Sequence, residues 1–373
     1  MPQKKLTEDF SLSFPAIRGT QAGREYYVSM CPLKLLTVMF REGIKDLPPE
    51  LKAQRELNKG RTLPIKRYII ENKDNYIFSS ITASIDREIK FDAYGENPIG
   101  RKIGTLRVPM DAKFIINDGQ HRLAAINEAL KEDSSIENET ISIVLFVDLG
   151  LTNSQQMFAD LNRYAVRPTK SLGILYDHRD PLSRLTNRLI NEVIVFKGMT
   201  EKAKSSISNR SRKLFTLSGI YQATKRLLQK GERQELSQKE KKLALEFWNT
   251  VGENMPDWMA AVNKKVATCE LRSDYIHAHG IALQALAIAG NSLIKAYPNG
   301  WGKKLSKIKK IDWARENAFI WEGRALVGGS LNKSQKNVTL TANYIKKEFG
   351  LSLDTREEEV EKNYVKGKNN IED

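Results

Sequence analysis

Residues 113–130 of this chain read KFIINDGQHRLAAINEAL, and this stretch decides the fold of the N-terminal half. The apolar run at 113–117 predicts a short strand, and Asp118-Gly119 predicts a turn. From His121 onward the apolar residues recur every three or four positions, which predicts a helix that reaches Leu130. The sequence therefore predicts a strand that turns tightly into a helix.

The segments around this stretch continue the same alternation. Residues 141–147, ISIVLFV, form a continuous apolar run, which is typical of a buried strand. Thr152, Asn153 and Ser154 can cap a helix that follows. Further upstream we predict strands at 24–30 and 76–85, a helix at 33–40 and a loop at 88–104. Alternating strands and helices predict an α/β (α+β) domain over residues 1–180.

Helical periodicity dominates after residue 180, and strand signals nearly vanish. The predicted helices are 181–195, 214–230, 238–250, 273–296 and 311–327. These helices predict a mostly α-helical domain at 181–350. Residues 351–373 are charged and poor in apolar side chains, so we predict a charged flexible tail there.

The composition is that of a folded protein with a strong basic excess. Apolar residues make up 40% of the 373, which is enough for a sizeable core. Lys and Arg number 60 against 45 Asp and Glu, and the formal net charge is +15. Such an excess favours a polyanionic partner, above all nucleic acid.

Several classes of protein can be set aside. Cys31 and Cys269 are the two cysteines of the sequence, and no CxxC motif exists, which argues against a disulfide framework or a cysteine zinc site. A redox role for either thiol stays open beside the more common case of a small buried side chain. We expect no metal site and no secretory signal. We also expect no membrane span, because no apolar run approaches the ~20 residues that a spanning helix needs. These absences predict a cytoplasmic protein.

The Asp118–Arg122 turn carries the clearest chemistry. Free N–H groups of the first helical turn favour an anion, and Gly119 allows a ligand close to the backbone. His121 and Arg122 add donors, and a guanidinium suits phosphate. In the alternative reading, Asp118 caps the helix, Gly119 serves the turn, and Arg122 pairs with a surface carboxylate.

Residues 116–126 resemble the DGQHR signature of proteins with a ParB/sulfiredoxin-like fold. Further stretches resemble one branch of that group, the DndB proteins of DNA phosphorothioate (sulfur) modification. They are PAIRG (15–19), GREYY (23–27), SQQMFADLNRYAVRP (154–168), SRKLFTL (211–217) and IHAHG (276–280). The resemblance implies promoter binding and transcriptional control of the modification gene cluster.

The same resemblance implies a nucleotide site at the turn. In sulfiredoxin a cysteine nucleophile stands where this chain has Gln120, and an amide cannot attack, so reductase chemistry is excluded. We expect a nucleotide, ATP or CTP with Mg²⁺, rather than a resident cofactor. The residues expected to bind it are Gly119, Gln120, His121, Arg122, Asn162 and Arg163. The catalytic residues of a nucleoside triphosphatase would be Asp118, His121 and Arg122.

For Asn162 and Arg163 a structural alternative stays open, because Asn162 can end its helix and Arg163 can be solvated. Arg61, Lys66 and Arg67 are weaker candidates for the same cleft, and an exposed helix face explains them equally well.

A second basic feature lies between Lys202 and Lys230, where no Asp or Glu occurs. Interleaved serines and Asn209 suit contacts with phosphates. The residues predicted to bind DNA are Lys202, Lys204, Arg210, Arg212, Lys213, Lys225 and Arg226. The alternative is a solvated surface, as for the lysines at 303–310.

The sequence thus predicts a DNA-binding transcriptional regulator, a repressor, of a phosphorothioate modification gene cluster. The alternative is a nucleoside triphosphatase, with DNA nicking, that uses the DGQHR motif. The expected partners are duplex promoter DNA, a second copy of the chain in a homo-oligomer, and other proteins of the modification system. We expect the homo-oligomer because palindromic operators match the two-fold symmetry of protein dimers.

Overall fold

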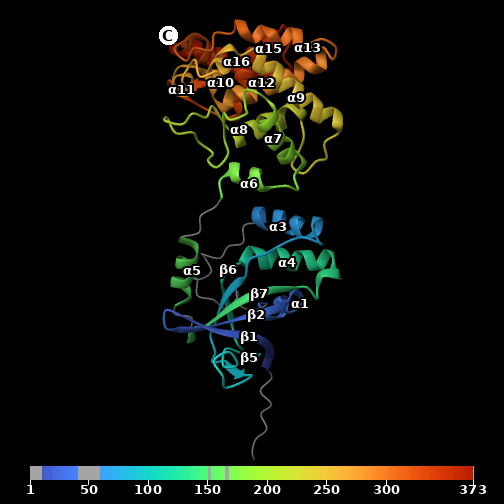
Figure 1. Ribbon diagram of the computed structural model, residues 1–373, viewed down its shortest axis with the longest axis vertical. Helices are drawn as coiled ribbons and strands as arrows, with labels where there is room; N and C mark the ends of the chain where they lie inside the picture. Colours follow the sequence, from blue (N-terminus) through green and yellow to red (C-terminus); the bar gives the residue numbers. More distant parts are fainter. Residues whose placement is uncertain (1–10, 41–58, 150–152, 164–167, 373) are drawn as a thin grey trace, which may run out of the picture. The chain divides into compact units, whose positions relative to one another are not determined.

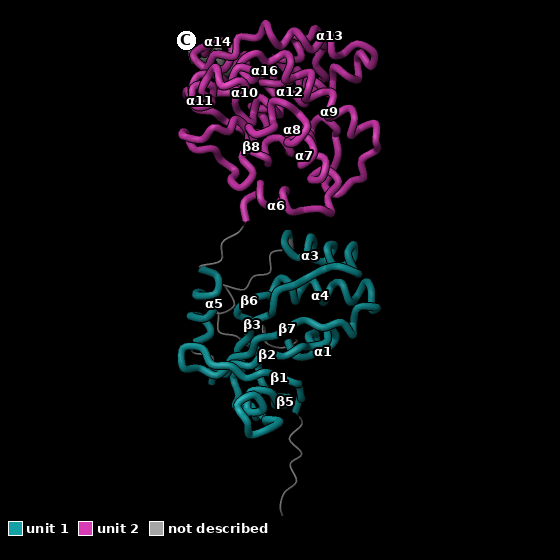
Figure 2. Tube along the Cα trace, viewed as in Figure 1, with its two compact units in different colours: residues 1–166 teal, residues 167–373 magenta. Residues whose placement is uncertain are grey.

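The computed structural model describes residues 11–40, 59–149, 153–163 and 168–372 (Figure 1). Two compact units divide the chain, residues 1–166 and 167–373, and each has its own hydrophobic core (Figure 2). This division falls earlier than the predicted boundary at 180. The hydroxyl of Ser171 donates to the carbonyl of Lys204, which ties the segment after residue 167 to unit 2.

Unit 1 is built on a seven-stranded mixed sheet with the order β4-β5-β1-β2-β7-β3-β6. Its strands are antiparallel neighbours except β3 and β7, which run parallel. The strands are β1 (Ser11–Gln21), β2 (Arg24–Pro32), β3 (Ile81–Ile85), β4 (Lys90–Ala93), β5 (Ile103–Pro109), β6 (Phe114–Asp118) and β7 (Thr140–Val147).

Helices α1, α3 and α4 of unit 1 pack together on this sheet. Helix α4 contacts α3 and α1, and the buried core joins Ile126 of α4 to Leu145 of β7 and Cys31 of β2. Helix α5 packs by itself against β6 (Figure 1). These helices are α1 (Leu33–Met39), α3 (Lys59–Glu71), α4 (Gln120–Glu132), the short 3₁₀ helix η1 (Ser134–Ile136) and α5 (Ser154–Arg163).

The structure confirms the predicted α/β character and changes its details. In β7 the buried residues alternate with half-buried ones, because successive side chains of a strand point to opposite faces of the sheet and one face is more deeply buried here than the other. The strand predicted at 76–85 is shorter and begins at Ile81. The predicted loop at 88–104 contains β4 and the start of β5, where Asp92 pairs with Thr105.

Unit 2 is mainly helical, as the sequence predicts. Helix α12 is its apolar centre and contacts α8 and α15. Its helices are α6 (Lys170–Tyr176), α7 (Pro181–Glu192), α8 (Leu217–Leu228), α9 (Gln238–Glu253), α10 (Pro256–Val262), α11 (Thr268–Asp274), η3 (Ile276–Ala278), α12 (Gly280–Ala296), α13 (Trp301–Leu305), η4 (Ser306–Lys310), α14 (Ala318–Trp321), α15 (Gln335–Phe349) and α16 (Thr355–Glu372). Its short strands are β8 (Thr200–Glu201), β9 (Phe215–Thr216), β10 (Leu326–Val327) and β11 (Ser330–Leu331).

Two predicted helices of unit 2 differ from the structure. The one at 273–296 is broken before α12, because Tyr275 leaves the helix and forms a bridge with Ala314. The one at 311–327 is reduced to α14, because Asn317 caps a new helix start and Gly323 turns the chain with a positive φ. Within the described residues, no helix has the length and apolar character needed to cross a membrane.

The end of the chain also differs from the predicted flexible tail at 351–373. Helix α16 packs against α15, and Glu361 and Tyr364 are buried there. The guanidinium of Arg324 contacts both carboxylate oxygens of Glu361, at 2.6 and 2.9 Å. The segment is charged because its buried contacts are themselves ionic, and composition alone cannot distinguish such contacts from solvated charge.

Candidate functional sites

The strand-to-helix turn in unit 1 is formed as the sequence predicts. Strand β6 ends at Asp118, Gly119 occupies the N-cap with φ of 102°, and α4 begins at Gln120. A Cβ at Gly119 would lie 3.0 Å from Nη2 of Arg122 and 3.1 Å from Ile81. Glycine is therefore required at the turn for its backbone conformation and for the room it leaves to Arg122.

Arg122 is the organising side chain of this turn. Its Nη2 donates to Oδ2 of Asp118 at 2.7 Å and to the carbonyl of Ser80 at 3.1 Å, and its Nη1 contacts the hydroxyl of Ser79. Asp118 does not cap α4, since no side-chain cap is formed at this helix. The alternative interpretation therefore holds for Gly119, which forms the turn, and for Arg122, which pairs with a carboxylate, but not for Asp118 as the cap.

Two buried polar atoms beside the turn have no hydrogen-bond partner among the described residues. They are Oδ1 of Asn117, whose side chain is fully buried, and Nε of Arg122. The Nδ2 group of Asn117 donates to Ser84 at 2.7 Å, which fixes which way the amide faces. Burying an acceptor and a donor without hydrogen-bond partners costs free energy, and a ligand that forms hydrogen bonds with both would remove this cost.

Both residues line a pocket of about 530 Å³, a size that suits a small-molecule ligand. The structure brings most of the predicted nucleotide residues together there, and Arg61 of α3, one of the weaker candidates, lines the pocket with them. The lining residues are Arg61, Ile65, Asn117, Asp118, Gly119, Gln120, His121, Arg122, Phe158 and Asn162. Arg163 is exposed on α5 and is not among them.

The electrostatics of this pocket favour a neutral imidazole. Burial lowers the pKa of His121, and the nearby charge of Arg61 lowers it further. Asn162 also makes a local contact, donating from Nδ2 to the carbonyl of Phe158 at 2.8 Å. Lys66, the weaker candidate, instead pairs with Glu132 at 2.6 Å.

The basic segment in unit 2 splits into two parts with different environments. Lys202, Lys204, Arg210 and Arg212 are exposed on the loop between β8 and β9. Within the described part of the chain, their side chains have neither an ion-pair nor a hydrogen-bond partner. These four residues are called the basic loop below.

The cations of helix α8 instead form contacts with other residues of unit 2. Arg226 donates to the side-chain oxygens of Gln284 at 2.8 Å and Gln335 at 2.7 Å, and burial lowers its pKa. Lys225 lies 3.5 Å from Glu232. The structure thus gives both predicted DNA-binding residues intramolecular contacts, because Arg226 reaches α12 and α15 and Lys225 faces the turn that follows α8.

Lys213 and Arg272 hold the basic loop in place. The ammonium of Lys213 donates to the carbonyl of Gly198 at 2.7 Å. Nη2 of Arg272 donates to the carbonyls of Ser208, Asn209 and Ser211 at 3.0–3.1 Å. Arg272 is not among the residues predicted from the sequence, since nothing in its local pattern shows that α11 lies under a loop some sixty residues earlier.

The two cysteines have opposite environments. Cys31 is fully buried, and burial raises the pKa of its thiol to about 12. Cys269 is exposed. Within the described residues, no group of three or more His, Cys, Asp and Glu side chains is placed to hold a metal ion.

We therefore expect a thiol-specific reagent such as Ellman's reagent to modify one thiol rapidly in the native protein and the second only after unfolding. A buried thiol with a raised pKa presents little thiolate to the reagent. Replacing Cys269 by serine should remove the rapid phase, whereas Cys31→Ser should keep it. Rapid labelling of Cys31 in the native state would contradict this assignment.

Comparison with known proteins agrees with the sequence resemblance. A family model described as DndB, DNA-sulfur modification-associated, matches residues 14–352, nearly the whole chain. A search of curated proteins and a search of solved structures each found no match, so the ParB/sulfiredoxin-like fold stays a prediction. The family model spans both the turn of unit 1 and the basic loop of unit 2, and the chain belongs to the DndB family of DNA-sulfur modification-associated proteins.

Proposed function

We propose that this protein binds duplex DNA at the promoter of a DNA phosphorothioate modification gene cluster and represses its transcription. The observation that carries the proposal is the basic loop, whose four cations are exposed and have no carboxylate partner among the described residues. Charges without internal partners are available to phosphates, and phosphate contacts dominate the affinity of proteins for DNA.

The anchoring of this loop supports the same proposal. Arg272 fixes three of its carbonyls, and Ser171 fixes the carbonyl of Lys204 at 2.8 Å. Because the backbone is already held by these contacts, less conformational entropy is lost when the loop meets DNA. Arginines in the loop can contact guanine edges as well as phosphates.

A mobility-shift titration of the purified protein on the DNA upstream of its own gene cluster tests the proposal. We expect binding that weakens steeply with salt, with a log–log slope of about −0.9 for each phosphate neutralised. A scrambled duplex of equal length should bind more weakly. Equal affinity for both duplexes would overturn the regulator role, and no binding to either would overturn DNA binding.

The assembly is a further part of this proposal. We propose that the protein acts as a homo-oligomer, since two-fold operators match dimers, and that it contacts other proteins of the modification system. Light scattering of the purified protein tests the first, and co-purification with the modification enzymes tests the second. A monomer at the concentration that saturates the promoter would contradict the oligomer.

The pocket at the turn of unit 1 supports a second candidate function, nucleotide binding with hydrolysis. The unpartnered Asn117 Oδ1 and Arg122 Nε would supply an acceptor and a donor to a ligand. Among the described residues that line the pocket, Asp118 is the one carboxylate, and it is paired with Arg122. Mg²⁺ bound mainly by nucleotide phosphates needs few protein carboxylates, so this lining fits ATP or CTP with Mg²⁺.

Arg122→Ala tests this candidate. We expect ATP or CTP binding, measured calorimetrically, to weaken about tenfold or more, because a charge-assisted hydrogen bond is lost. Gly119→Ala should have a similar effect, since its Cβ would meet Arg122. Arg87→Ala, an exposed cation of the same unit, is the control. Phosphate release that persists in Arg122→Ala would contradict hydrolysis at this turn.

A further inference from the structure

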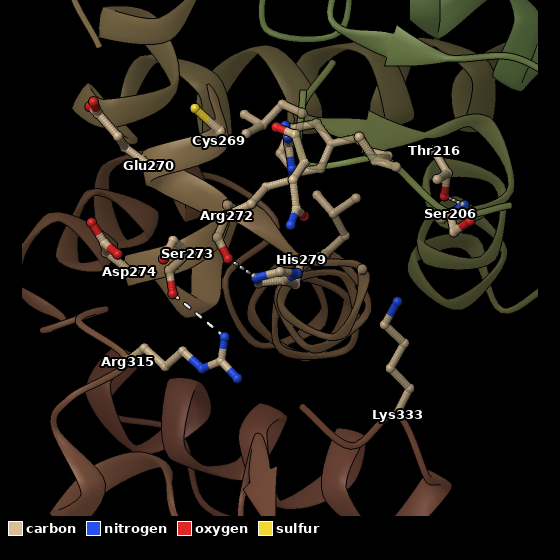
Figure 3. Close-up of a pocket in the computed structure, with 18 of the residues that line it drawn as sticks. Ser206, Thr216, Cys269, Glu270, Arg272, Ser273, Asp274, His279, Arg315 and Lys333 are labelled. Atoms are coloured by element: carbon tan, nitrogen blue, oxygen red, sulfur yellow. Dashed lines mark hydrogen bonds between the residues drawn. The ribbon is translucent and has the colours of Figure 1, made fainter. Parts of the chain in front are cut away.

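A second pocket of about 710 Å³ lies in unit 2, beside the basic loop (Figure 3). Ser205, Ser206 and Asn209 form one wall, helix α11 and the start of α12 form another, and Arg315 and Lys333 complete it. This pocket is not predicted from the sequence. Its lining joins segments from 205 to 333, so it exists only in the folded unit.

Three cations converge on this pocket, Arg272, Arg315 and Lys333. Arg272 and Arg315 donate to backbone carbonyls, for example from Arg315 Nη2 to Gly329 at 2.9 Å. Within the described ranges none of the three forms an ion pair with a carboxylate, and the ammonium of Lys333 has no acceptor. Uncompensated cations repel one another, and an anion between them would relieve this repulsion.

The ammonium of Lys333 also lies at the start of helix α12. A Cβ placed on Gly280 would be 3.8 Å from its Nζ. The N-cap residue His279 makes no side-chain cap, and the amides of Gly280 and Ile281 donate to no acceptor in the described part of the chain. A lysine next to the positive end of a 17-residue helix is electrostatically unfavourable unless an anion lies between them.

Among the described residues, no carboxylate that lines the pocket forms an ion pair with these cations. His279 donates from Nε2 to the carbonyl of Arg272 at 2.7 Å, and burial together with the surrounding cations lowers its pKa to about 4. The acidic residues Glu270 and Asp274 lie at one edge in Figure 3, with their carboxylates turned away from Lys333.

We propose that this pocket binds the phosphate group of a phosphate ester. The phosphate would lie between Lys333, Arg315 and the open amides of α12. The pocket is larger than one phosphate requires, and Leu214, Phe215 and Leu283 give it apolar wall that suits the organic part of an ester. The same chemistry is presented by a free sugar phosphate and by the backbone of a DNA strand.

Lys333→Gln tests the proposal, because this exposed side chain has no partner whose loss would disturb folding. Lys336→Gln, another exposed lysine three residues further along in the first turn of α15, is the matched control. We expect inorganic phosphate and ribose 5-phosphate, titrated with ³¹P NMR detection on the full chain, to bind the wild type. Binding should weaken about tenfold in Lys333→Gln and stay unchanged in Lys336→Gln.

A second titration with promoter duplex distinguishes the two sources of phosphate, and this arm alone rests on the proposed DNA-binding function. Weaker duplex binding by Lys333→Gln, with ribose 5-phosphate competing at constant ionic strength, would identify the DNA backbone as the ligand. Unchanged duplex binding with weakened ribose 5-phosphate binding would identify a free phosphate ester. Wild-type protein that binds neither phosphate probe, or a Lys333→Gln variant that binds them as well as wild type, would overturn the proposal.

Discussion

Replacing Lys202, Lys204, Arg210 and Arg212 together by glutamine is expected to weaken promoter binding by about 100-fold or more near 0.1 M salt. Each lost phosphate contact removes about 0.9 from the log–log salt slope, so the slope should become shallower by roughly 3.6. These four side chains are exposed and have no internal partners within the described residues, so the fold should be unaffected. The measurement is a mobility-shift titration at several salt concentrations.

The control for this variant must carry the same change in net charge. Lys303, Lys309, Lys310 and Lys336 are four exposed lysines of unit 2 outside the basic loop. Replacing all four by glutamine should change the affinity much less, because a general loss of positive charge acts only through the long-range field. Equal losses in the two variants would show that net charge, rather than the basic loop, determines DNA binding.

Glu361→Ala is expected to lower the stability of unit 2 by about 3 kcal/mol. The substitution would leave the guanidinium of Arg324 buried without its carboxylate, although the carbonyl of Leu340 would still accept from Nη1 at 2.8 Å. For a unit of this size, such a loss lowers the melting temperature by roughly 6–12 °C. Thermal unfolding followed by circular dichroism measures the effect.

Glu359→Ala, an exposed acid two positions earlier on α16, is the control and should melt as the wild type does. The pH dependence provides a second readout. Burial raises the pKa of Glu361, but Arg324 and Lys347 outweigh burial and hold it below the usual value. The stability from this pair is therefore complete above the unfolded pKa of about 4.3 and is lost as the pH falls through the lower folded value. Equal melting of both variants would favour the flexible tail that the sequence predicts.

The candidate site at the turn was the most predictable part of the molecule. A strand, a glycine turn and a helix start are local features, so the pattern of residues 113–130 was sufficient to place Gly119 and Arg122 at a junction. The unpartnered oxygen of Asn117 could not be predicted, and Arg61 could be named only as a weaker candidate for this cleft. Both depend on how α3 and β3 pack around the turn, and the spacing of residues along the sequence does not reveal this packing.

The basic segment shows the limit of reading charge from sequence. Residues 202–230 have one sign of charge throughout, yet the structure exposes the loop cations and uses Arg226 inside the helical unit. Composition records how many charges there are, whereas a partner distant in sequence decides whether each one is available. Gln284 and Gln335 lie 58 and 109 residues away from Arg226 along the chain.

The α/β and helical halves, the turn at Asp118–Arg122 and membership of the DndB family can be recognised without the tertiary structure. These follow from local periodicity, from turn chemistry and from motifs that are contiguous in the chain. Tertiary packing determines which of the described cations lack an intramolecular partner. It also places α16 against α15 and brings Arg272, Arg315 and Lys333 to one pocket. Each of these depends on contacts between segments far apart in sequence, and only packing brings such segments together.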